Sequence, residues 1–174
     1  MEKPEFLYHG SPEENIDELE PRISKGTGEK FGSFVYASPD LTTASFFLAD
    51  IEQEWSAGRF GNIPYTLIPV PREEFIKMDK GGYIYVLPSE DFESDPERGL
   101  REYEWASKKA VKPLRKIKYS SALDAMIENG VQVYFVDQNT YKQIKESKDH
   151  GLSILMNMES ENQRRGKNIK PFTK

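Results

Sequence analysis

The chain contains no cysteine and only two histidines, His9 and His150. The missing cysteines exclude disulfide bonds, thiolate zinc sites and cysteine nucleophiles. The two histidines lie far apart and neither has a partner at ligand spacing, so we expect no metal site. No signal peptide and no stretch of membrane-spanning length is evident, which predicts a cytoplasmic protein without a membrane partner. The lack of cysteine does not by itself argue against secretion.

The composition fits one soluble domain. The 174 residues include 30% charged side chains and carry a net charge of -5, which suits a single solvated domain with a buried core. The acidic balance argues against a general nucleic-acid coat protein. From about Asn162 the chain has five basic residues, no acidic ones and little to bury. We therefore predict one domain over residues 1–161 and a basic, mobile tail over 162–174.

Apolar alternation and turn residues predict short strands and short helices in a mixed order, hence an α+β fold. Runs of β-branched and aromatic residues predict strands at 6–9, 33–37, 65–70, 83–87, 101–106, 111–119 and 131–136. Capping residues predict helices over 39–51 behind a Ser38 cap, over 72–78, from Ser121 to Gly130, and after Asp137. Pro113 implies that its strand bends or lies at a sheet edge.

Two segments near the start carry side chains suited to binding. The strand that ends in His9 and Gly10 can place an imidazole at a cleft rim, with an open backbone beside it. Tyr36, just before a helix that carries Phe46 and Phe47, offers a flat face to a planar ring. Each segment also has a purely structural explanation, because a strand-end histidine can bond a neighbour and aromatic side chains can fill a core.

A third segment, residues 101–106, alternates acidic and aromatic side chains. Period-two alternation puts Glu102 and Glu104 on one face of the strand, with Tyr103 and Trp105 on the other. Two carboxylates on one face repel unless water or a ligand disperses their charge. The arrangement therefore suits a cleft that meets a cationic or hydroxyl-rich ligand. An edge strand with a solvated acidic face is the alternative.

Taken in order, the segments 8–11 (YHGS), 35–38 (VYAS, before a helix) and 102–107 (EYEWAS), with a later Val-x-Pro at 111–113, form a recognisable set. This set resembles the ADP-ribosyltransferase superfamily, in the histidine-tyrosine-glutamate branch that includes the diphtheria-type toxins and the poly(ADP-ribose) polymerases. The resemblance runs from about Phe6 to Val136. It implies a split mixed β-sheet core with short flanking helices, NAD as co-substrate and no metal.

The resemblance also implies a role for each matching residue. His9 would hydrogen-bond a ribose hydroxyl of NAD, and Gly10, followed by Ser11, would hold the nicotinamide amide through its backbone. Tyr36 would stack on the nicotinamide ring. Phe47 would cover the other face of that ring, at a place where the polymerases have tyrosine.

The same resemblance implies a catalytic glutamate at the start of a late strand, and Glu104 is our choice. Glu102, two residues upstream, would then orient the acceptor, as in the Glu-x-Glu of arginine-specific transferases, although the arginine and Ser-Thr-Ser elements of that branch are not evident. Which of the two is catalytic stays open. A carboxylate fits the chemistry, because breaking the bond between ribose and nicotinamide builds positive charge on the sugar, as in glycoside hydrolysis.

The basic strip, Lys108 to Lys118, holds six basic residues and no acidic one. It is either a solvated strand face or a contact for phosphates of NAD or of a nucleic-acid acceptor. The expected function is NAD-dependent mono-ADP-ribosyl transfer to an unknown acceptor. Two alternatives remain. A tRNA 2′-phosphotransferase would share the fold but needs an Arg-His-Arg-Arg set, for which two arginines are not found. A silent NAD-binding or ADP-ribose-binding module, or a phage-type interaction protein, would retain only the fold.

Overall fold

The computed structural model of the chain describes residues 2–23, 32–51, 54–94 and 103–172. It confirms the predicted α+β class. The strands of this part of the chain are β1 (Phe6–Ser11), β2 (Arg22–Ile23), β3 (Ser33–Ala37), β4 (Ser56–Phe60), β5 (Ile63–Ile68), β6 (Gly82–Pro88), β7 (Trp105–Ser107), β8 (Arg115–Tyr119) and β9 (Gln132–Phe135). The helices are α1 (Leu41–Ser45), α2 (Arg72–Met78), α3 (Ala122–Glu128), α4 (Gln138–Glu146), α5 (Leu152–Leu155) and α6 (Glu161–Arg164).

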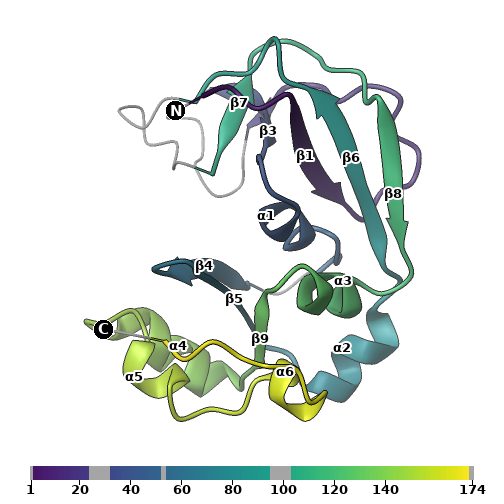
Figure 1. Ribbon diagram of the computed structural model, residues 1–174. Coiled ribbons are helices and arrows are strands. Elements are labelled where there is room, and N and C mark those ends of the chain that lie inside the picture. Colours follow the sequence, from purple (N-terminus) through teal and green to yellow (C-terminus); the bar gives the residue numbers. More distant parts are fainter. Residues whose placement is uncertain (1, 24–31, 52–53, 95–102, 173–174) are drawn as a thin grey trace.

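The described strands form three small sheets, in the orders β1-β6-β8, β2-β3-β7 and β4-β5-β9. Pairing is antiparallel except between β5 and β9, which run parallel. The first two sheets lie together in the upper part of Figure 1, and the third lies below them with α1 and α3 in between. Helices α4, α5 and α6 lie on the far side of the third sheet.

Apolar side chains fill the space between these layers in four clusters. One face of β1-β6-β8 packs against β3 and β7, with Leu7, Tyr85 and Trp105 buried together. Its other face packs on α1 and α3. The third sheet is covered by α2 and α3 on one face and by α4 and α5 on the other. Every sheet therefore has apolar cover, and the elements around β1, β3 and β7 have fixed positions.

Two of the predicted helix starts have their expected caps. The Ser121 hydroxyl accepts a hydrogen bond from the Asp124 N–H, and α3 begins behind it. Asp137 likewise accepts from the Thr140 N–H at the start of α4. In both cases the cap satisfies a backbone donor that has no partner inside the helix, so the local sequence determines where the helix begins.

Helix α1 is much shorter than predicted, and its cap is Asp40 rather than Ser38. The Asp40 carboxylate accepts from the Thr43 N–H at 2.6 Å, and the helix ends at Ser45. The Ser45 hydroxyl bonds back to the Thr42 carbonyl at 2.7 Å, and the next turns use the tighter i to i+3 bonds. Hydroxyl and β-branched residues favour such local bonding over a continued helix, and apolar periodicity alone does not reveal this.

The described part of the segment predicted as a tail packs against the third sheet. Asn162 donates to the Val131 carbonyl and accepts from the Val133 N–H, so it bonds beside β9. Phe172 is only 5% exposed and contacts Phe60 and Tyr65 ring to ring. The boundary predicted at residue 162 therefore falls within packed structure, because a few buried side chains anchor a stretch whose composition is mainly polar.

The strand predicted over 101–106 is present as β7, over Trp105–Ser107. The candidate Glu102 lies outside the described residues, whereas Glu104 lies directly before the strand. Strand β8 begins two residues after Pro113 and is the last strand of its sheet, as the proline suggested.

Candidate active site

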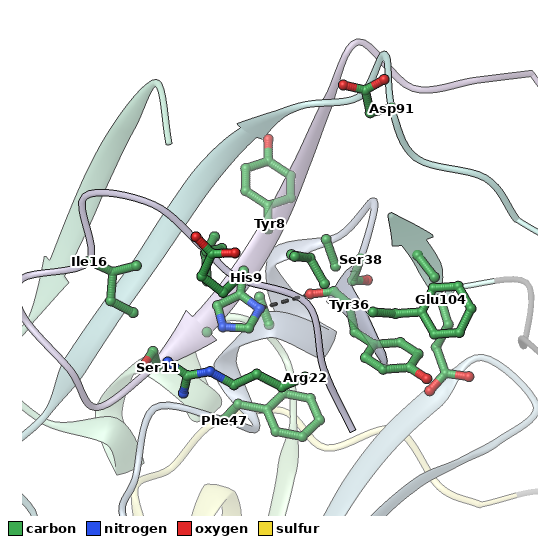
Figure 2. A pocket seen from close by; sticks show the side chains of 18 of the residues that line it. Tyr8, His9, Ser11, Ile16, Arg22, Tyr36, Ser38, Phe47, Asp91 and Glu104 are labelled. Carbon is green, nitrogen blue, oxygen red and sulfur yellow. Dashed lines mark hydrogen bonds between the residues drawn. The ribbon is translucent and has the colours of Figure 1, made fainter. Parts of the chain in front are cut away.

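A cavity of about 1250 Å³ opens between β1, β3, β7 and α1. It is lined by all the described residues for which the resemblance implied a role: His9, Gly10, Ser11, Tyr36, Phe47 and Glu104. Figure 2 shows several of these side chains facing a common space. Residues almost a hundred positions apart in the sequence are therefore neighbours around one opening.

Strands β1 and β3 run side by side only briefly at this cavity. Tyr8 and Ser38 exchange backbone hydrogen bonds of 2.7 and 2.9 Å and form a single bridge. In an antiparallel ladder, residues two apart present their backbone groups to the same edge. The N–H and C=O of Gly10 therefore point to the edge of β1 away from β6, toward the cavity that Gly10 lines.

Gly10 also has a packing reason to be glycine. A Cβ built at this position would lie 1.9 Å from the Ala44 carbonyl oxygen in α1, and α1 would have to move to admit it. The close approach of α1 to β1 therefore depends on the missing side chain. The missing side chain of Gly10 therefore allows the close packing of α1, and the backbone of the same residue faces the cavity.

His9 is held in one orientation by a backbone group. Its Nδ1 lies 2.8 Å from the Tyr36 carbonyl oxygen, which can only accept, so Nδ1 carries the hydrogen. Enclosure by protein atoms lowers the pKa of His9 below its ordinary value of 6.5. The bond to Tyr36 acts in the opposite direction, and the positive charge of Arg22 lowers the pKa further. The imidazole is then neutral at pH 7, with Nε2 as a hydrogen-bond acceptor.

This pKa shift can be measured by proton NMR. Because the native state disfavours the imidazolium, the His9 signal should titrate with a midpoint below 6.5, and native stability should fall as the pH drops below that value. His150→Gln removes the only other histidine and assigns the signal. Arg22→Gln should raise the midpoint, because a nearby positive charge is lost. A His9 midpoint at or above 6.5 would contradict the described surroundings.

Two groups of aromatic side chains in the cavity are those on β3 and those just after α1. Tyr36 and Phe34 lie two positions apart on β3, and their ring centres are 5.9 Å apart. Phe46 is 6% exposed and belongs to the core, whereas Phe47 is 51% exposed and lines the cavity. Of the two adjacent phenylalanines, only Phe47 is therefore placed to cover a ligand. The Phe47 ring makes an edge-to-face contact with the Trp55 ring, at 5.7 Å between centres.

Glu104 reaches the cavity because of strand alternation. Trp105 and Ser107 are buried, and Tyr36 on β3 is paired with Ala106. Alternation puts Glu104 and Lys108 on the same face as Ala106, and all three line the cavity. Glu104 itself is half-buried. In Figure 2 its carboxylate points toward the space that Tyr36 also faces.

Sequence reasoning missed several residues of the cavity. Arg22, beside His9, follows an irregular stretch that gives no pattern to interpret. Phe34 and Lys108 could have been found, because each lies two residues from a strand position on the cavity face, Tyr36 and Ala106 respectively. Ser11 lines the cavity, and its hydroxyl also accepts from the Glu13 N–H at 3.1 Å, which stabilises the turn after β1.

The basic strip divides into two parts. Lys108 and Lys109 line the cavity, whereas Lys116 lines a separate pocket of about 230 Å³ and donates to the Glu14 carbonyl. Lys116 and Lys118 both lie over the Tyr83 ring, at 5.1 and 5.7 Å from its centre. Only the beginning of the strip is thus placed to meet a ligand bound in the large cavity.

Comparison with family models, with curated proteins and with solved structures gives no match to this chain. Among the described residues, no three carboxylate or histidine side chains gather in a way that could bind a metal ion. Within the same ranges, no helix has the length and apolar character needed to cross a membrane. The site must therefore be interpreted from its own geometry.

Proposed function

We propose that the protein is an NAD-dependent mono-ADP-ribosyltransferase, which cleaves the bond between nicotinamide and ribose and transfers ADP-ribose to an acceptor. The observation that carries the proposal is the meeting of His9, Tyr36 and Glu104 around one cavity. These three groups come from β1, from β3 and from the residue just before β7.

The chemistry needs a group that stabilises positive charge. As the bond from C1′ of the ribose to the nicotinamide nitrogen breaks, the electron pair leaves with nicotinamide and the sugar becomes oxocarbenium-like. A carboxylate beside the sugar lowers the energy of that state. Glu104 supplies it. A nucleophilic oxygen or nitrogen of the acceptor, or of water, then bonds to C1′ and releases its proton.

The other residues would bind and orient the dinucleotide. The neutral Nε2 of His9 can accept a hydrogen bond from a ribose hydroxyl, because Nδ1 already donates to the Tyr36 carbonyl. Tyr36 and Phe47 would cover the two faces of the nicotinamide ring. The backbone edge at Gly10 would pair with its amide group, which both donates and accepts. Such fixed contacts lower the entropic part of the barrier.

We also propose that the core is the split sheet of the ADP-ribosyltransferases. The single bridge between β1 and β3, followed by the cavity beside it, supports this assignment. The cavity of about 1250 Å³ exceeds the usual range for one small ligand, roughly 300–1000 Å³. It therefore leaves room for an acceptor group beside the dinucleotide. Among the described lining residues Arg22 is the one arginine, which disfavours the phosphotransferase with its three.

Incubation of the purified chain with NAD tests the proposal. Nicotinamide release is followed by chromatography, and NAD binding is measured separately by calorimetry. We expect saturable binding and catalytic release. Binding without any release would favour the silent module, and no binding of NAD or ADP-ribose would overturn the proposal.

A further inference from the structure

Arg59 connects three parts of the molecule that lie far apart in the sequence. It is on β4, in the hairpin of the third sheet. Its Nη2 lies 3.2 Å from both carboxylate oxygens of Asp40 and 3.0 Å from the Thr43 hydroxyl. Its guanidinium carbon lies 5.2 Å from the centre of the Tyr103 ring. One side chain thus contacts the start of α1 and the segment before β7.

Both contacted segments belong to the candidate site. Thr43 and Tyr103 line the cavity, and Tyr103 is directly followed by Glu104. Asp40 is the N-cap of α1, the helix that leads to Phe47. Arg59 itself is not among the described lining residues. Any effect of Arg59 on a bound ligand would therefore pass through these neighbours.

A purely structural ion pair explains this arrangement poorly. The Arg59 and Asp40 side chains are 21% and 37% exposed, and exposed or half-exposed pairs contribute little stability. The Arg59 Nε is buried and has no hydrogen-bond partner within the described part of the chain, which is unfavourable. What arginine adds over simpler residues is a planar group that can pair with a carboxylate and lie over an aromatic ring at once.

We propose that Arg59 is a positioning residue for Glu104, a role that rests on the proposed function of the cavity. The guanidinium holds the Tyr103 ring against the start of α1, and the backbone that leads into β7 is thereby fixed. The Glu104 carboxylate is then held at one place beside the cavity. Because the barrier to bond cleavage depends steeply on where the charge lies, a small displacement of this carboxylate slows the reaction.

Steady-state kinetics of nicotinamide release test this role with Arg59→Met and Arg59→Lys. For Arg59→Met we expect kcat to fall about tenfold or more, since displacement acts on the chemical step, while KM changes little. For Arg59→Lys we expect kcat to recover in part. The lysine ammonium group can pair with Asp40 and lie over Tyr103, but it lacks the planar set of N–H donors of a guanidinium group. Arg115→Met, the same change at an exposed residue of β8, is the control and should keep the wild-type kcat.

A double variant tests whether the effect passes through Tyr103. If it does, adding Arg59→Met to Tyr103→Leu should lower kcat little beyond Tyr103→Leu alone, since the two changes break the same link. If the fold-losses in kcat of the two single variants multiply in the double variant, Arg59 acts on the reaction independently of Tyr103. An unchanged kcat in Arg59→Met, or a loss confined to KM, would overturn the inference.

Hydrogen exchange gives a readout that does not need activity. In Arg59→Met the amides of residues 103–105 should exchange faster than in the wild type, whereas Arg115→Met should leave them unchanged. Thermal melting shows that each variant is folded, and Arg59→Lys replaces Arg59→Met if the latter is not. Unaltered exchange at 103–105 refutes the positioning role whether or not NAD is cleaved. A wild type without nicotinamide release refutes only the proposed function.

Discussion

Replacement of Glu104 by glutamine should slow nicotinamide release by about a hundredfold or more, since the variant loses the charge that the proposed mechanism places against the developing cation. NAD binding should survive largely unchanged. Glutamine has nearly the same size and can still hydrogen-bond a ribose hydroxyl, but it cannot neutralise the sugar in the transition state. Single-turnover chromatography of nicotinamide, with calorimetry of NAD, measures the two quantities separately.

Glu93→Gln is the matched control for this experiment. Glu93 lines the same cavity and is exposed, and only its backbone bonds to Ala106. Its replacement removes the same charge from the cavity wall and should leave the rate within about twofold, because charges exposed to water are screened. Equal rates for wild type and Glu104→Gln would reject Glu104 as the catalytic carboxylate. The same assay on Glu102→Gln then tests the second candidate.

The second large effect concerns stability. Arg72→Met should lower the free energy of unfolding by about 2–3 kcal/mol, because it leaves the Glu161 carboxylate, whose side chain is only 1% exposed, with Arg165 as its remaining ion-pair partner among the described residues. Arg72 Nε and Nη2 donate to the two carboxylate oxygens of Glu161 at 2.6 and 2.7 Å. The expected loss lies below the range for fully buried pairs because Arg72 is 30% exposed. Urea denaturation at pH 7 measures it.

The pH dependence of this pair has a definite sign. The hydrogen bond from Arg72 lowers the pKa of Glu161 below its ordinary value of 4.5. The pair therefore contributes its full stability above pH 4.5 and loses it as the pH falls through the lowered native pKa. Arg72→Met should show a weaker loss of stability in acid than the wild type.

Lys142→Met serves as the control, because it removes an exposed pair with Glu146 at 3.9 Å and should shift the urea midpoint very little. The double variant Arg72→Met with Glu161→Met should regain part of the loss, since no buried charge is then left with a reduced set of partners. A midpoint in Arg72→Met that equals that of the wild type would show that α6 is not held to α2 by this contact.

The sequence predicted the elements whose boundaries are determined locally. Strand β3 has the predicted bounds, and the helices behind Ser121 and Asp137 begin where their caps lie. The strand β4 was missed, because its sequence (SAGRF) contains alanine, glycine and arginine and no run of β-branched residues. Its pairing with β5 comes from the tertiary structure, which a local pattern does not contain.

The same division holds for the candidate site. His9, Tyr36 and Glu104 could be proposed because each lies in a short motif at the end or start of a predicted strand, although β1 continues past His9 to Ser11. That they line one cavity depends on how β1, β3 and β7 pair, and no single segment contains that information. Arg59 had no local signal at all, since its partners are a helix cap and a ring that become neighbours only in the folded chain.

The tight approach of α1 to β1 at Gly10 has a practical consequence for mutational scans. Any side chain introduced there collides with the Ala44 carbonyl, so variants at this position should reduce the amount of folded protein in a cell as well as any enzymatic output. An inactive Gly10 variant would therefore not show whether the activity was lost because little folded protein accumulated or because the reaction itself was impaired. Glu104→Gln, which alters charge but scarcely alters volume, is the better inactive reference for work in living cells.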